Sequence, residues 1–177
     1  VHDCVADHGG GVYADEADVT IAGHGQVRDC AAADHGGGVN ANEARVTIAG
    51  HAQVRDCVAE YGGGFFVWSG SIAVKDHAAV TSCAAKFGGG LALRSASAAV
   101  EGQAAVRACV ASGGNGGGAY MVQTSLVVKD QASITECESM QGGGVFSRNK
   151  SRLLLQGDAA VTRCRAEEHG GGIFMRR

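Results

Sequence analysis

Cysteine recurs along the chain at intervals of 26 to 28 residues, and its thiol is the most reactive side chain the sequence offers. The column consists of Cys4, Cys30, Cys57, Cys83, Cys109, Cys137 and Cys164. If the repeats stack as parallel strands about 4.8 Å apart, neighbouring cysteines come within disulfide range. The interpretation we adopt is a ladder of small buried thiols that fill a bend. Cross-linking between neighbours stays open, although seven cysteines leave at least one thiol unpaired.

Histidine forms two shorter columns. One contains His24, His51 and His77, and the other contains His8, His35 and His169. Stacked imidazoles could bind a transition metal or respond to pH. Other repeats carry Gln, Asn, Asp, Tyr or Phe at the same positions, which is typical of a polar turn surface. Zinc sites also need clustered ligands, so we predict no metal site and no cofactor.

Charged side chains flank the cysteines. Arg28 and Asp29 occupy the two positions before Cys30, and Arg55 and Asp56 repeat them one unit later. Stacked carboxylates beside a basic group could hold calcium and serve acid–base chemistry. Both columns change residue type further along the chain, however, so a solvated charged stripe is the default. We therefore predict no catalytic residue.

Aromatic residues follow a recurring glycine tag, defined here as three glycines and an aliphatic or similar residue. If the residue after the glycines points inward, alternation points the next residue outward. The outward column would then be an exposed stripe that binds sugars or proteins. The opposite phase stays open. The candidate binding residues are Tyr13, Phe66, Tyr120, Phe146 and Phe174, extended by Trp68.

These columns must be positioned by a repeating unit. The tags begin at Gly9, Gly36, Gly62, Gly88, Gly116, Gly142 and Gly170. A fixed period in this range indicates a solenoid in which each unit stacks on the next. Glycine triplets provide sharp bends or positive φ. A phosphate cradle is disfavoured, because neither a helix nor a Lys-Ser/Thr pair follows the glycines.

Period-2 apolar columns predict the strands. Val46 and Ile48 represent two columns that lie two residues apart, and Val54 represents a third. With a short alternation after each tag, this makes three short strands per coil of 26 to 27 residues. The prediction is an all-β, right-handed parallel β-helix of about six to seven coils, forming a single repeat domain over residues 1–177. The cysteine-to-tag gap varies between 5 and 7 residues, so insertions collect just before the glycines.

The composition argues against several classes of function. The net charge is −3 and no basic run exists, so nucleic acid is not an expected partner. The absence of proline suits a sheet-built chain. No apolar run is long enough for a membrane span, and no signal peptide is visible. We expect the chain to be a segment of a longer repetitive protein.

The tag and the cysteine box carry a family resemblance. Gly36-Gly37-Gly38-Val39 and Val54-Arg55-Asp56-Cys57 resemble, in the same order, the GGA-(I/L/V) and FxxN repeats of the polymorphic outer membrane proteins of chlamydiae and related surface β-helix proteins. The resemblance extends over all seven units, with glycine in place of the family's alanine and cysteine in place of its asparagine. It implies a pectin-lyase-like β-helix with an adhesin role.

The expected function is therefore a non-catalytic structural or adhesive module. It would be a rod or filament on the cell surface or outside the cell that binds proteins or glycans along one face. End-to-end or assembly contacts at the coil ends are also expected, because these ends present unpaired strand edges. Two alternatives stay open: a carbohydrate-active lyase or hydrolase, and a scaffold subunit capped by partners in a large assembly. The missing long insertions, which would wall a substrate groove, disfavour the enzyme.

Overall fold

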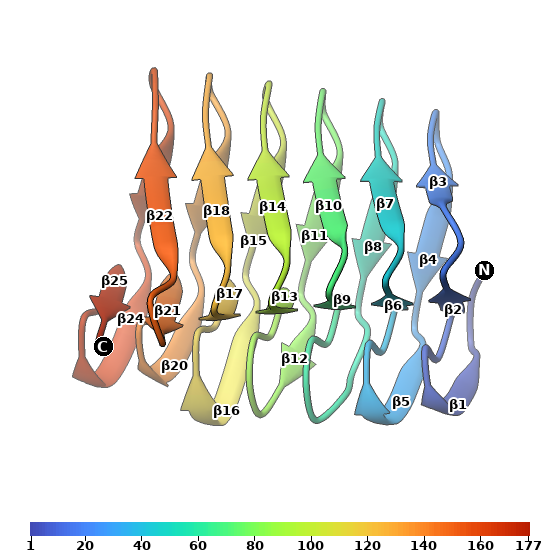
Figure 1. Cartoon of the computed structure of the whole chain (residues 1–177), viewed down its shortest axis with the longest axis horizontal. Coiled ribbons are helices and arrows are strands. Elements are labelled where there is room, and N and C mark those ends of the chain that lie inside the picture. Colours follow the sequence, from blue (N-terminus) through green and yellow to red (C-terminus); the bar gives the residue numbers. More distant parts are fainter.

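The structure, a computed structural model that describes all 177 residues, is an all-β solenoid. Its strands pair in parallel with the equivalent strands of the neighbouring coils. Figure 1 shows the coils side by side along the long axis, with the N- and C-termini at opposite ends. The sheets that run the length of the molecule contain six or seven strands, so the predicted parallel β-helix of six to seven coils is confirmed.

Most coils contribute four strand segments, where the sequence predicts three; in the coil of Cys57 the additional segment is reduced to isolated bridges at Val58 and Tyr61. The additional segment lies between the cysteine and the glycine tag, as in β5 (Ala31–His35). Only Ala32 of this strand is buried, so it lacks the apolar alternation that reveals the other strands. Its variable length also breaks the register, as the shift between β1 and β5 illustrates.

The strands group into four faces. The seven-stranded sheet contains β2 (Val12–Asp15), β6 (Val39–Asn42), β9 (Phe65–Trp68), β13 (Leu91–Arg94), β17 (Ala119–Val122), β21 (Val145–Arg148) and β25 (Ile173–Met175). One six-stranded sheet contains β3 (Val19–Ile21), β7 (Arg45–Ile48), β10 (Ser71–Val74), β14 (Ser97–Val100), β18 (Ser125–Val128) and β22 (Arg152–Leu155). The other contains β4 (Gln26–Arg28), β8 (Gln53–Arg55), β11 (Ala79–Thr81), β15 (Ala105–Arg107), β19 (Ser133–Thr135) and β23 (Ala160–Thr162). The fourth face contains β1 (Val5–His8), β5, β12 (Ala84–Ala85), β16 (Val110–Asn115), β20 (Glu138–Gln141) and β24 (Arg165–His169).

A residue with positive φ lies at each of the four corners of a coil. In the second coil these residues are Gly36, Glu43, Gly50 and Asp56, with φ values of 64°, 48°, 70° and 56°. The acidic column before the cysteines is thus a turn column, and it keeps this conformation even where it holds Ala108. Asp, Asn and Gly tolerate the left-handed region best, which explains why small polar residues dominate these corners.

The three glycines of each tag serve different purposes. Gly36 adopts the left-handed conformation that makes the bend. A Cβ on Gly37 would lie 2.4 Å from the carbonyl oxygen of Val58 in the next coil. A Cβ on Gly38 would lie 2.7 Å from Cγ1 of Val54. The backbone therefore approaches its neighbours so closely that no side chain fits at either of the last two positions.

The core runs the whole length of the solenoid as one cluster of 34 buried residues. The predicted apolar columns point into it, and Val46, Ile48 and Val54 are fully buried. Burial of such stacked aliphatic side chains contributes roughly 1.5–3 kcal/mol each. This continuous core holds the four faces in register and so positions the side chains on the outside.

Candidate functional site

The glycine tags set which side of the seven-stranded sheet carries the aromatic residues. Phe65 and Val67 of β9 are fully buried in the main core, whereas Phe66, between them, lies outside this core. The same alternation holds in β17 and β21, where Tyr120 and Phe146 belong to a separate hydrophobic cluster. The aromatic column therefore points away from the solenoid axis.

The predicted exposure of this column is wrong for three of its members. Tyr13 and Trp68 are 54% and 49% exposed, but Phe66, Tyr120 and Phe146 are only 9%, 6% and 1% exposed. Phe174 is half-buried. The physical reason is that residues just before the glycine tags lie against these rings. Phe87, for example, packs on the cluster of Tyr120, Val122 and Phe146.

Together, the residues before and after the tags form one aromatic ladder. It runs from His8 through His35, Tyr61, Phe87, Tyr120, Phe146 and Phe174 to His169, and successive ring centroids lie 5.0–5.7 Å apart. The ladder changes column between Phe87 and Tyr120, where one coil has Ala92 after its tag and the next has Asn115 before its tag. Sequence reasoning treated the two columns separately and missed this; the signal was that every coil has a ring in at least one of them.

Arginines border the ladder. They stand two residues after the aromatic column, on the same side of the sheet, and sequence reasoning missed them as well. The guanidinium groups of Arg94, Arg148 and Arg176 lie 6.0, 5.5 and 5.8 Å from the rings of Trp68, Tyr120 and Phe146 respectively. Nε of Arg148 is buried without a hydrogen-bond partner. Burial raises the pKa of Tyr120, and the neighbouring Arg148 lowers this pKa and so partly offsets the effect of burial.

Two hollows adjoin along this face. One, of about 290 Å³, is lined by His8, Tyr13, His35, Asn40, Asn42, Phe66, Trp68 and Arg94. The other, of about 280 Å³, shares His35, Phe66 and Arg94 with it and continues past Tyr120 to Arg148. We call the two hollows together the aromatic groove. Half-exposed rings flank its first part, where Asn42 donates a hydrogen bond to Asp15 at 2.5 Å.

The cysteine ladder lies inside the solenoid. Cys30, Cys57, Cys83, Cys109 and Cys137 are buried, Cys4 and Cys164 are partly buried, and all seven are free thiols. The thiol of Cys57 donates to the carbonyl oxygen of Arg55 at 3.1 Å, and the other cysteines repeat this contact. Burial raises the pKa of the Cys30 thiol. Because the thiols are small, enclosed and hydrogen-bonded to backbone carbonyl groups, the ladder is suited to filling the bend.

The charged pairs beside the cysteines face solvent. Arg28 Nη1 lies 2.7 Å from Asp29 Oδ2, and Arg55 Nη1 lies 2.5 Å from Asp56 Oδ2. Each pair belongs to a single coil and stands at a left-handed corner. Their arrangement is that of exposed ion pairs, which contribute little to stability.

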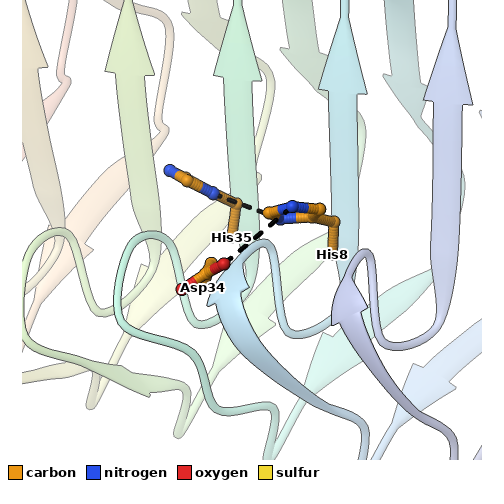
Figure 2. A group of neighbouring side chains, drawn as sticks. All are labelled: His8, Asp34 and His35. Carbon is orange, nitrogen blue, oxygen red and sulfur yellow. Dashed lines mark hydrogen bonds and ion pairs between the residues drawn. The ribbon is translucent and has the colours of Figure 1, made fainter.

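The two histidine columns differ in geometry. His24, His51 and His77 are exposed and stack nearly parallel, with centroids 5.4 and 4.9 Å apart. His8 and His35 instead come together with Asp34, and one ligand atom from each of the three lies within 4.8 Å of the others (Figure 2). This cluster is at one end of the aromatic groove, because both histidines line it.

The structure contains no helix that is long and apolar enough to cross a membrane. Comparison with protein-family models, curated proteins and solved structures finds no match for the chain. Its function must therefore be inferred from the aromatic groove and the residues around it.

Proposed function

We propose that this chain is a non-catalytic adhesive module that binds an extended glycan in the aromatic groove. The observation that carries the proposal is the hollow of about 290 Å³ between the half-exposed rings of Tyr13 and Trp68. A sugar presents an apolar C–H face and a rim of hydroxyl groups. An aromatic ring packs against the C–H face, and planar polar side chains form hydrogen bonds with the hydroxyl groups.

The polar side chains beside these rings favour a glycan over an apolar protein surface. Asn42, Asp15 and Arg94 offer an amide, a carboxylate and a guanidinium group, which together donate to and accept from hydroxyl groups. Arg94 also lies against Trp68 and so limits the ring's freedom. A site with few mobile groups loses little entropy when a ligand binds.

The solenoid suits a polymeric ligand. Each coil advances by one strand spacing of about 4.8 Å, and residues of several successive coils line the groove, so the groove is elongated along the solenoid axis. The resemblance of the tags and cysteine boxes to polymorphic outer membrane protein repeats supports a surface role. An extracellular or cell-surface location, as a rod or filament, is part of this proposal.

Replacement of Trp68 by Ala tests the proposal. The chain is screened against a panel of polysaccharides, and the affinity for the best ligand is measured by isothermal titration calorimetry. We expect Trp68→Ala to weaken binding by about tenfold, which corresponds to the roughly 1.4 kcal/mol of one aromatic contact. Leu155→Ala is the matched control, because Leu155 is similarly exposed but lies on β22 in a different sheet.

Equal affinities of the two variants for the glycan would refute the groove as the binding site. The polysaccharides from the same incubations are analysed for cleavage. Release of new polysaccharide ends would show that the protein is a carbohydrate-active enzyme. Circular dichroism of both variants verifies that the solenoid is intact.

A further inference from the structure

A one-residue insertion creates the cluster of His8, Asp34 and His35. Strand β5 pairs with β1 through Val5↔Ala31, Ala6↔Ala32 and His8↔His35, so β5 has one residue more between its last two partners. Such a bulge re-aims the side chains around it. As a result, Asp34 and His35 both lie next to His8 of the preceding coil (Figure 2).

The distance between the two histidines of the cluster matches that around a metal ion. Nδ1 of His8 and Nδ1 of His35 are 3.3 Å apart. Two nitrogens bound to Zn²⁺ at a tetrahedral angle lie about 3.4 Å apart, because each Zn–N bond is about 2.0–2.1 Å. Oδ2 of Asp34 is 3.9 Å from Nε2 of His8, the ring nitrogen that does not face His35. One ligand atom from each of the three residues lies within 4.8 Å of the others, and the exposed side chain of Asp34 must rotate to bring an oxygen to the third ligand position.

The surroundings hold His35 in place. Its ring lies 4.3 Å from that of Phe66 and stacks on Tyr61 at 5.4 Å. A fixed ring loses little freedom when a metal ion binds.

We propose that His8, His35 and Asp34 bind one divalent transition-metal ion of the Zn²⁺ class. Two imidazoles and one carboxylate suit Zn²⁺, whereas Ca²⁺ and Mg²⁺ require oxygen ligands. Three protein ligands leave at least one coordination position open. Because His8 and His35 line the aromatic groove, the ion borders the groove.

The chain contains a natural counterpart that lacks one ligand. The register shift recurs where β20 pairs with β24, and it brings Gln141, Glu168 and His169 into the places of His8, Asp34 and His35. Here the side chain of Gln141 donates a hydrogen bond to Glu168 at 2.6 Å. An amide in place of the first imidazole removes a metal ligand, so this second cluster serves as the control.

The experiment measures Zn²⁺ binding to the full chain by competition with a chromophoric chelator. We expect one equivalent to bind to the wild type. His8→Gln, which copies the second cluster, should weaken binding at least tenfold, and His169→Gln should leave it unchanged. His8 and His169 are both exposed, so neither substitution disturbs the core. Equal affinity of His8→Gln and the wild type would overturn the proposal.

Binding of Co²⁺ separates this site from the cysteines. The proposed ligands predict a cobalt spectrum without thiolate-to-metal charge-transfer absorption. Appearance of that absorption in the one-equivalent complex would place the ion on the cysteine ladder and would also overturn the proposal. Because these readouts do not involve a glycan, they are independent of the proposed adhesive function.

Discussion

At the residue scale, individual positions require glycine for different physical reasons. Gly37 lies in ordinary backbone conformation, and its need for glycine comes from the closeness of the next coil. Gly23 is the opposite case, since its φ is +64° but a Cβ added there would have no atom within 4 Å. Gly37 therefore reports the effect of steric contact between coils, and Gly23 reports the effect of left-handed backbone conformation.

We expect Gly37→Ala to destabilise the chain by about 3 kcal/mol or more, because the added Cβ meets two backbone oxygens that belong to the adjacent coil. Gly23→Ala should cost only about 1–2 kcal/mol, the penalty of a left-handed alanine. Urea unfolding followed by circular dichroism measures both. Equal losses of unfolding free energy in the two variants would show that the close approach of the coils is not the reason why Gly37 must be glycine.

At the scale of elements, the cysteines mark the turns that join one six-stranded sheet to the fourth face. Five are enclosed by the coils on both sides, while Cys4 and Cys164 are partly exposed. Aromatic residues behave similarly on the outside, where strands of adjacent coils cover each other's rings. Position within the stack thus controls exposure, although every repeat has a similar sequence.

A thiol-reactive reagent tests this arrangement. In the native chain we expect two thiols to react rapidly, those of Cys4 and Cys164, and the other five to react only on unfolding. The double variant Cys4→Ala/Cys164→Ala is the control and should lose the rapid phase. Rapid reaction of more than two thiols would contradict the buried ladder. Fewer than seven thiols in the denatured, non-reduced chain would reveal disulfides.

At the scale of the whole molecule, stability is shared between neighbouring coils. Gln53 pairs with Ala79, so residues 53–78 make one complete turn of the solenoid. Removing this turn joins Ala52 to Ala79 with every sheet still in register. Removing residues 53–65 instead places the seven-stranded sheet where a six-stranded sheet should begin.

We expect the chain without residues 53–78 to fold cooperatively, with a smaller urea m-value because less surface is exposed on unfolding. The chain without residues 53–65 should not show cooperative unfolding. Circular dichroism and urea titration of the two deletion variants make the comparison. Cooperative folding of both, or of neither, would argue against coils as the units of stability.

The sequence by itself determined the repeat, the parallel solenoid and the inward columns represented by Val46, Ile48 and Val54. These features depend on local alternation and on a period that every coil repeats. It also indicated that an aromatic column follows the tags. The strands of the fourth face escaped prediction, because a segment such as Ala31–His35 has a single buried residue and no visible period.

Only the tertiary structure decided how neighbouring coils combine. Three features depend on pairing between residues of different coils: Phe146 is buried, Arg148 lies against Tyr120, and Asp34 contacts His8. Such pairing is set by register and by bulges, where one inserted residue changes which side chains meet. The physical reason is that a repeat specifies each coil alone, whereas the groove and the cluster exist only between coils.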